Sequence, residues 1–476
     1  MVPPPNVFVI GAKGQKFDSA GDVLQREKDK LEDDIIALKK TKAPLLGKEN
    51  TEDAVKKIDD EIKQKGDKIK EKEVALQSPG LDEIEELAEL IKPLEVNDHY
   101  TEIRLGGNSY SRDSCKQIGE LLRKQKKLKS IKLDDIFIGR LLSEIPTAID
   151  YLLKPLLEVH TLQEIDLSYN AFGFNTKDPL VDFLKAHLPL RHLILVNNGL
   201  GPEAGAEVAM ALVELGARKI QARTNPEIKY EIPHLETINC SRNRLEGGSM
   251  QAWAHAVKAN GKGLRKITMS TNDIRADGIE TLLLTGIRHA PDLEALDLRD
   301  NTPRSEDKDR DGVDALAEVV VELPSLRELG LTYWGLEMDG WKKVAEALAK
   351  GKNKKLEVLK LKGNEINELG VKIVGYLAKK GLPALRKIEL DENPFDAEGG
   401  NFKALKGLME RRKERLGKDD DDNAWGFGEL EELEEPESDD DSDWDWDAEA
   451  ESVTGDEEAD TAIDELGEKL KSATIQ

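Results

Sequence analysis

Cysteine and long apolar runs are both scarce in this chain. Only two cysteines, Cys115 and Cys240, occur among 476 residues, which is too few for a disulfide framework and suits a reducing compartment. No uninterrupted apolar stretch approaches the roughly 20 residues that span a bilayer, and the first residues lack the basic start and apolar region of a secretory signal. We therefore expect a soluble cytosolic or nuclear protein.

Basic residues are missing from one long acidic segment. Between Asp419 and Glu468 there are 25 acidic residues and no lysine or arginine, whereas the whole chain has 95 acidic and 70 basic residues and a net charge of −25. The rest of the chain therefore carries 70 residues of each sign. We interpret residues 418–476 as an acidic, largely disordered tail on a neutral body. A neutral body argues against net attraction to nucleic acid or to an anionic membrane, so neither is an expected partner.

Motifs of conventional enzymes are also absent: there is no G-x-x-x-x-G-K-[ST] loop, no H-E-x-x-H and no G-x-S-x-G. One stretch does match a calcium loop, with Asp307, Asp309, Asp311 and a glutamate, Glu318, at its twelfth position. A repeat strand precedes it where an EF-hand needs a helix, and Asp314 stands where an apolar residue is usual. These departures favour a solvated insertion, and we expect no metal and no cofactor of the chain's own.

The pattern L-x-x-L-x-L-x-x-N recurs along the chain, and it is the strongest signal in the sequence. Ten units carry it between about residues 100 and 395, many of them 28 to 30 residues apart. Eight of these units keep the asparagine, at Asn108, Asn170, Asn198, Asn243, Asn272, Asn301, Asn364 and Asn393. The other two have Ile136 and Trp334 at this position.

Alternating leucines in a short strand direct every second side chain into one core, and the asparagine can bond backbone groups in the turn that follows. The remaining half of each unit has the periodicity of an amphipathic helix. Strand plus helix in about 29 residues predicts an α/β leucine-rich-repeat horseshoe, ribonuclease-inhibitor-like, with about 10–11 repeats, a parallel inner sheet and outer helices. We place this domain at residues 79–417.

Two segments precede the repeat domain. Residues 1–21 contain a degenerate first repeat strand near residues 7–18. Residues 22–78 form a charged helical insert, for which a solvated hairpin is favoured over a coiled coil that docks a partner. The stretch Gly80–Lys92 resembles a leucine-rich export signal, but its spacing also fits the outer helix of an early repeat, which we favour.

At the rim, where turns leave the strands, the repeats stop being interchangeable. Asn197 is additional, because its neighbour Asn198 already fills the asparagine position. Asp135 and Arg140 lie where the pattern breaks, and Arg242 follows another strand. Apart from a functional role, Asn197 could be an ordinary exposed polar residue, and Arg140 could form a surface salt bridge. Because these residues come from successive units, they predict a protein-binding edge rather than a catalytic pocket.

At these residues the sequence resembles the Ran GTPase-activating proteins, in their compact fungal form. The resemblance covers about residues 98–417 and the acidic tail. It rests on D-I-F-I-G-R at 135–140 with E-I-P at 144–146, N-A-F-G at 170–173, N-N-G-L-G-P-E-A-G at 197–205 and R-N-R-L-E-G-G-S-M at 242–250.

The resemblance implies a GTPase activator acting in trans on Ran-GTP, in support of nucleocytoplasmic transport. The family docks its rim on the switch regions and orders the GTPase's own glutamine, without an arginine finger. The family's key asparagine corresponds to Asn197 and its anchoring arginine to Arg140, with Asp135, Asn170 and Arg242 as further partner-binding residues. GTP and Mg²⁺ belong to the partner. A monomer in the cytoplasm or near the nucleus is expected, acting alone or with a Ran-binding protein.

The chain departs from the compact fungal pattern in its insert at residues 22–78, and it lacks the C-terminal domain of animal members and the nuclear-envelope domain of plant members. A rival hypothesis is a non-catalytic scaffold or inhibitor that holds its partner on the concave strands. For the acidic tail two roles stay open, solubility and electrostatic attraction of a basic partner surface.

Overall fold

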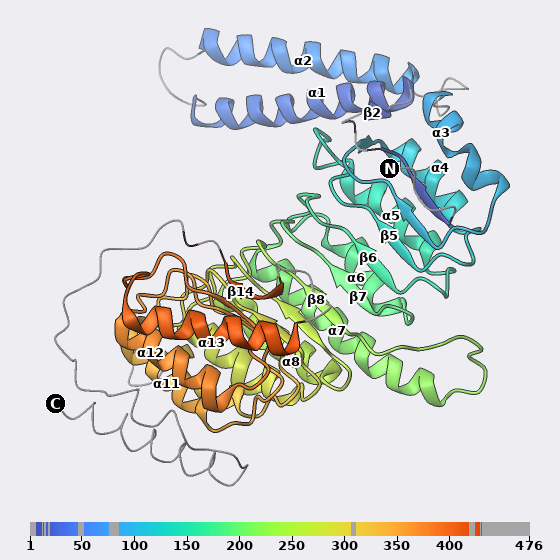
Figure 1. Ribbon diagram of the computed structural model, residues 1–476. Helices are drawn as coiled ribbons and strands as arrows, with labels where there is room; N and C mark the ends of the chain where they lie inside the picture. Colours follow the sequence, from blue (N-terminus) through green and yellow to red (C-terminus); the bar gives the residue numbers. More distant parts are fainter. Residues whose placement is uncertain are drawn as a thin grey trace. The chain divides into compact units, whose positions relative to one another are not determined.

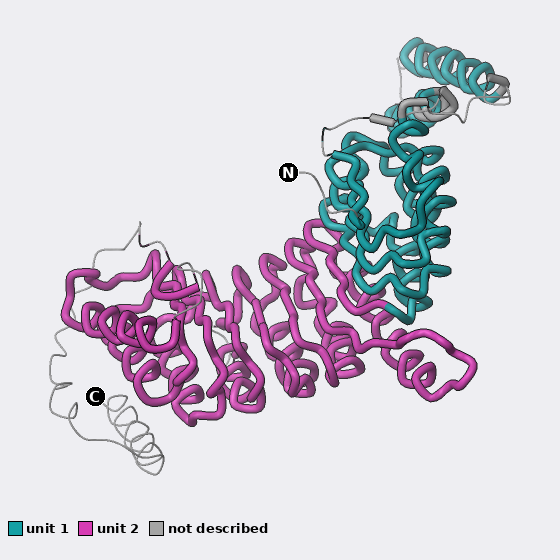
Figure 2. Tube along the Cα trace, turned by 45° about the vertical axis from the view of Figure 1, so that its right-hand side comes forward, with its two compact units in different colours: residues 1–189 teal, residues 190–476 magenta. Residues whose placement is uncertain are grey.

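The computed structural model contains two compact units, Met1–Pro189 and Leu190–Gln476, which Figure 2 colours separately. The residues that it describes are 6–11, 13, 16–17, 20–45, 52–75, 85–305, 311–417, 424–428 and 430. Asp307 and Asp309 of the calcium-loop pattern, residues 80–84 of the stretch that resembles an export signal, and most of the acidic tail therefore lie outside the described residues. In the described ranges no helix is both long and apolar enough to cross a membrane.

The first unit contains a parallel sheet whose strands follow the order β1-β3-β5-β6. These strands are β1 (Val7–Val9), β3 (Glu102–Arg104), β5 (Ser130–Lys132) and β6 (Glu164–Asp166). β1 pairs with β3 at the place of a first repeat strand. A separate parallel pair joins β2 (Lys16–Phe17) to β4 (Ser109–Tyr110). The repeat helices are α4 (Arg112–Leu122), α5 (Ile145–Leu156) and α6 (Lys177–Ala186).

The charged insert forms two helices, α1 (Ala20–Lys42) and α2 (Glu52–Ala75), which pack against each other as a hairpin (Figure 1). A short 3-10 turn, η1 (Ala43–Leu45), follows α1. Ion pairs join the helices at Lys28–Glu73 (3.1 Å) and Lys65–Asp34 (2.7 Å). Among the described side chains of the two helices none is fully buried. The hairpin is therefore held by charge pairs and a half-buried apolar seam.

Helix α3 (Glu85–Val96) covers part of the stretch that resembles an export signal. Its Leu87, Ile91 and Leu94 are buried, whereas Leu90 is 40% exposed. α3 packs against α4. The stretch therefore has the burial of a repeat helix.

The second unit contains eight parallel strands in chain order. They are β7 (His192–Ile194), β8 (Thr237–Asn239), β9 (Lys266–Thr268), β10 (Ala295–Asp297), β11 (Glu328–Gly330), β12 (Val358–Lys360), β13 (Lys387–Glu389) and β14 (Gly426–Phe427). Figure 1 shows the helices of this unit on one side of its strands. They are α7 (Gly201–Thr224), α8 (Met250–Asn260), α9 (Ala276–Thr281), α10 (Gly312–Val320), α11 (Glu337–Ala349), α12 (Glu368–Tyr376) and α13 (Gly400–Leu416). Short 3-10 turns, η2 (Gly247–Ser249) and η4 (Ile287–His289), and short π turns, η3 (Leu282–Gly286) and η5 (Leu377–Gly381), lie beside them in the chain.

The apolar positions of the repeat pattern explain why the strands and the helices pack against each other. In each three-residue repeat strand the central residue is buried, as at Ile238 and Ile267, which are also register partners. Cys240 directly follows β8, two residues after Ile238, and is a buried free thiol in the same core. Burying a side chain of this size stabilises the fold by about 2 kcal/mol, repeated in every unit. The predicted fold class, an α/β leucine-rich-repeat array with parallel strands on one side and helices on the other, is confirmed.

The start of the acidic tail folds onto the last repeat. Strand β14 pairs in parallel with β13, with the N–H of Gly426 donating to the carbonyl of Arg386 at 2.8 Å. Trp425 is only 8% exposed, and the ring of Phe427 lies 4.9 Å from that of Phe402. An unpaired strand edge is a template for aggregation, and β14 covers the edge of β13. Residues 424–428 therefore belong to the repeat domain rather than to a structureless tail.

We expect a chain that ends after Gly417 to be less stable than a chain that ends after residue 430. Loss of the buried Trp425 and the half-buried Phe427 side chains removes about 2–4 kcal/mol and exposes the edge of β13. Urea unfolding and light scattering of the two chains, with the full chain as reference, measure both effects. Equal stability of the two truncated chains would refute a capping role for β14.

Candidate functional site

In the ten units that carry the leucine pattern, the residue just before the asparagine position has a left-handed backbone. We name this position the turn slot. Its occupants are Gly107 (φ 72°), Asp135 (53°) and Tyr169 (62°) in the first unit, and Asn197 (56°), Arg242 (59°), Thr271 (55°), Asp300 (57°), Tyr333 (53°), Gly363 (64°) and Glu392 (53°) in the second. Left-handed backbone costs most L-residues about 1 kcal/mol, and only glycine, asparagine and aspartate adopt it readily. The repeat turn, and not residue preference, therefore imposes this geometry.

The asparagine that follows the turn slot holds the turn. Asn243 is fully buried, and its Nδ2 donates to the carbonyls of Leu195 (2.7 Å) and Cys240 (3.1 Å). Its Oδ1 accepts the N–H of Asn198 at 3.0 Å, and its own N–H donates to Oδ1 of Asn272 at 2.8 Å. Each asparagine thus bonds the turn of a neighbouring repeat, which satisfies buried backbone groups. The ladder fixes where the turn slots lie.

Asn197 is exposed on this fixed turn. Its backbone N–H donates to the carbonyl of Ser241 at 2.9 Å, while its side chain makes no hydrogen bond with any described residue. Asn198 beside it is fully buried in the ladder. A primary amide offers two donors and one acceptor oxygen. The backbone of Asn197 is therefore fixed, while the polar groups of its side chain are exposed to solvent.

Arg242 occupies the turn slot of the next repeat and is also exposed. Its backbone N–H donates to the carbonyl of Ser270 at 2.9 Å. Because β7 and β8 are paired parallel strands, about 4.8 Å apart, Asn197 and Arg242 lie side by side along the edge. Arg244, two residues further, is exposed and left-handed as well (φ 54°). The second unit thus presents an amide beside two arginines.

In the first unit, Asp135 and Asn170 are brought together, but in different roles. The N–H of Asp135 donates to the carbonyl of Ser168 at 2.8 Å, and Asp135 is partly exposed in its turn slot. Asn170 is 2% exposed; its Oδ1 accepts the N–H of Ile136 and its Nδ2 donates to the carbonyl of Leu133 at 2.8 Å. Asn170 therefore supports the turn that carries Asp135, and a direct contact with a partner stays a prediction.

Arg140 lies inward, whereas the sequence suggested an arginine on the surface. Its side chain is 1% exposed, and its Nη2 donates to the carbonyl of Ser109 at 2.7 Å. Its Nη1 lies 4.0 Å from Oε2 of Glu144, which is also buried. Gly139 before it is left-handed (φ 68°), which turns the chain back toward β4. Burial of both charges makes this a buried ion pair rather than the surface salt bridge of the alternative reading.

We expect Arg140→Ala to lower the free energy of unfolding by about 2–4 kcal/mol, because it leaves the buried carboxylate of Glu144 without its cation. Glu144→Gln added to it should restore part of the loss, since the uncompensated charge is then gone. Lys154→Ala is the matched control: it breaks an i,i+4 pair with Asp150 in which the lysine is 71% exposed, and should cost under about 0.5 kcal/mol. Urea unfolding measures all three; no recovery in the double variant contradicts the buried-charge account.

Sequence reasoning missed two exposed aromatic residues near these turns. Tyr169, in the turn slot before Asn170, is 52% exposed, and Phe174 is 51% exposed. The Nζ of Lys177 lies 4.9 Å above the ring of Phe174. Ile138 and Leu142, around Arg140, are exposed too. The available signal was the position of Tyr169 relative to the asparagine, which is the same as that of Asn197.

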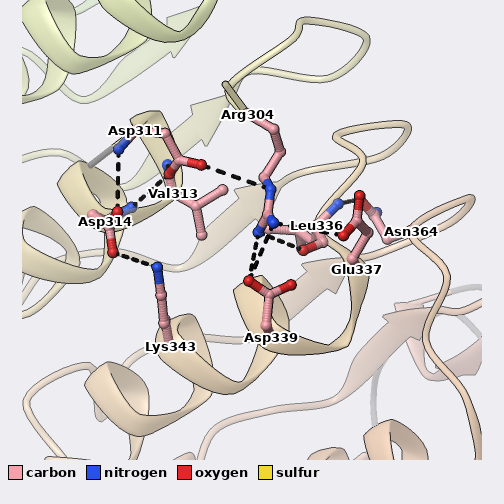
Figure 3. A network of polar contacts seen from close by, with 9 residues as sticks. All are labelled: Arg304, Asp311, Val313, Asp314, Leu336, Glu337, Asp339, Lys343 and Asn364. Carbon is pink, nitrogen blue, oxygen red and sulfur yellow. Dashed lines mark hydrogen bonds and ion pairs between the residues drawn. The ribbon is translucent and has the colours of Figure 1, made fainter. Parts of the chain in front are cut away.

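The described part of the calcium-loop pattern is engaged elsewhere. Asp311 caps α10, accepting the N–H of Val313 at 2.8 Å, and its carboxylate lies 3.6 Å from Arg304 (Figure 3). Glu318 pairs with Arg288 at 2.9 Å. Within the described ranges no three His, Cys, Asp or Glu side chains are grouped as metal ligands. The segment acts in this structure as a helix cap and an inter-repeat tie.

Repeated strand, asparagine ladder and helix define a leucine-rich-repeat protein with polar side chains gathered in its turn slots. The chain is 32% identical over 320 residues to Ran GTPase-activating protein 1 of Saccharomyces cerevisiae. The matched region covers 65% of this chain and 75% of the relative. The chain belongs to the Ran GTPase-activating protein family. The resemblance seen in the sequence is thereby confirmed.

Other comparisons cover less. This chain is 33% identical to the Ran GTPase-activating protein of Drosophila melanogaster, over 41% of this chain and 31% of that protein. It is 32% identical to Ran GTPase-activating protein 1 of Xenopus laevis, over 41% of this chain and 33% of that protein. A solved leucine-rich repeat-containing protein from Legionella pneumophila is 15% identical, covering 62% of this chain and 92% of that chain with a TM-score of 0.33. No family model matches the chain.

Proposed function

We propose that this protein stimulates GTP hydrolysis by the small GTPase Ran, acting in trans through its turn slots. Membership of the family supports the activity, since the relatives' names state it. The observation that carries the proposed site is Asn197, an exposed amide with no hydrogen-bond partner in the described chain, held on a turn fixed by the ladder. Such a group is preorganised for a partner and costs little ordering on contact.

In the proposed mechanism the partner supplies GTP, Mg²⁺ and the glutamine that orients the attacking water. The role of this chain is to hold that glutamine in its productive position. The amide of Asn197 can donate to the glutamine oxygen or accept from its nitrogen, which restricts the side chain without a charge entering the active site. An arginine finger, worth about 10³–10⁵ in rate where it is used, is not part of this proposal.

Arg242 and Asp135 are proposed to contact the partner's switch regions from their own turn slots. Arg140, because it is buried, is proposed to anchor the complex by fixing the stretch that carries Asp135, Ile138 and Leu142. Its guanidinium holds the carbonyl of Ser109 in the neighbouring repeat. Arg140 is then a positioning residue, and its loss should weaken both binding and rate.

We further propose that the protein acts as a monomer in the cytoplasm or near the nucleus, on Ran-GTP alone or together with a Ran-binding protein. It needs no cofactor of its own in this mechanism.

Single-turnover hydrolysis of GTP bound to Ran, with and without the full chain, tests the proposal. We expect a saturable acceleration as the chain is added. An unchanged turnover at saturating chain, with binding still measurable, refutes the activator and supports a non-catalytic scaffold. In that case substitutions on the strand faces, such as Lys266→Ala on β9, should weaken binding more than Arg242→Ala.

A further inference from the structure

A basic cleft lies on the second unit, at the end of β8 opposite the turn slot of Arg242. Its volume is about 340 Å³, and its polar lining includes Lys219 and Arg223 of α7, His234 before β8, and Lys262 after α8. The described residues that line it include no carboxylate. Since the body of the chain is electrically neutral, this gathering of one sign is a local feature that an opposite charge would relieve.

Two of the cations are fixed by backbone carbonyls rather than by acidic side chains. The Nζ of Lys219, which is 1% exposed, donates to the carbonyls of Leu190 and Pro233, the latter at 2.8 Å. Arg223 donates from Nε to Ile232 (3.0 Å) and from Nη2 to Pro233 (2.9 Å). These bonds use two of the three donors of the lysine and one edge of the guanidinium. They preorganise the remaining N–H groups at the cleft.

The electrostatics of the cleft agree with this geometry. Burial and, less, the charge of Arg223 lower the pKa of Lys219 to about 7. Burial and the three neighbouring cations also lower the pKa of His234. Glu236 acts in the opposite direction on Lys219, but it is already paired with Arg191 at 2.8 Å. A bound anion would stabilise the protonated form of both groups.

A purely structural role, tethering the loop 225–234 to α7, would explain why Lys219 and Arg223 lie in the cleft. It does not explain Lys262. The side chain of Lys262 is exposed and makes no hydrogen bond or ion pair with a described residue. The floor is rigid, because Asn260 joins α8 to α7 by donating to the carbonyl of Leu212 at 2.9 Å. Gly216 lets the two helices approach, since a Cβ there would lie 3.1 Å from the carbonyl of Ala259.

We propose that this cleft binds a phosphate group, with Lys219, Arg223 and Lys262 as its donors. Phosphate matches several converging N–H donors better than a single carboxylate does, because it presents more oxygens and up to two charges. The site is separate from the turn slots, so the proposal does not depend on the activity toward Ran.

Calorimetric titration of the full chain with inorganic phosphate, at constant ionic strength in chloride, tests the site. We expect saturable binding that Lys262→Gln weakens ~10-fold, the effect of one lost charge-assisted hydrogen bond. Lys258→Gln, the same change on an exposed position of α8 outside the cleft, should leave the affinity unchanged. Acetate should show no saturable binding.

A parallel titration with glycerol 2-phosphate identifies the source of the group: tighter binding of the ester indicates a phosphate monoester, and tighter binding of phosphate indicates the free ion. Three results would overturn the proposal: no saturable binding of either compound, equal affinities of the Lys262→Gln and Lys258→Gln variants, or acetate binding as tightly as phosphate.

Discussion

Asn197→Gly should lower the maximal rate at which the chain stimulates GTP hydrolysis by Ran, by about 100-fold or more, with a smaller effect on binding. Removing a group that stabilises only the transition state typically lowers the rate by this factor. Glycine is the informative replacement, because it keeps the left-handed backbone of the turn slot without strain, whereas Asn197→Ala adds about 1 kcal/mol of strain. Single-turnover rates over a range of chain concentrations separate the rate from the affinity.

Thr271→Gly is the matched control for Asn197→Gly. Thr271 occupies the turn slot two repeats further along with nearly the same φ (55°), and its backbone N–H donates to a carbonyl of the next repeat in the same way. If the side chain of Asn197 carries the effect, the control keeps the wild-type rate. A normal rate in Asn197→Gly, or an equal loss in both variants, would show that the site assignment is wrong.

Asn243→Ala should lower the free energy of unfolding by about 3 kcal/mol or more, the largest stability loss expected from a single polar side chain here. It removes the bonds that the Asn243 side chain makes to the carbonyl of Leu195 and to the N–H of Asn198, and each buried group that loses its partner costs about 1–3 kcal/mol. Since these bonds set the turns of Asn197 and Arg242, activity should fall as well. Urea unfolding monitored by circular dichroism measures the loss.

Asn243→Asp sharpens this test, because it keeps the shape and the acceptor oxygen but replaces the amide donor. A carboxylate oxygen would then face the carbonyls that the amide now bonds, so we expect at least as large a loss. Asn197→Asp makes the same chemical change on an exposed side chain and should change stability by less than about 0.5 kcal/mol. A stable Asn243→Asp variant would contradict the donor role of the ladder.

Much of the fold was predictable because it depends on local periodicity. The position of Ile238 or Ile267 in its repeat determines that it faces the core, since the side-chain period of a strand is two. Asn243 and Asn272 were predictable in the same way, because each asparagine serves the turn of its own unit and of its neighbour. Because Asn198 already fills the asparagine position of its repeat, Asn197 beside it could also be singled out as an additional asparagine.

The burial of Arg140 could not be predicted from its surroundings in the sequence. Its partner carbonyl, that of Ser109, lies 31 residues earlier in the chain and reaches it only when two repeats stack. The capping strand β14 was hidden for a similar reason: a glycine and a phenylalanine within acidic sequence give no strand signal, and only the open edge of β13 recruits them.

The sequence by itself determined the repeat, the inward leucines, the ladder asparagines and the family, because each of these follows from spacing or from motifs along one chain. Only the tertiary structure decided which polar side chains remain available. It turned Arg140 inward, exposed Tyr169 and Asn197 in equivalent turn slots, and gathered Lys219, Arg223 and Lys262 around one cleft. Exposure depends on what neighbouring repeats cover, and that is a property of stacking that spacing along the chain does not contain.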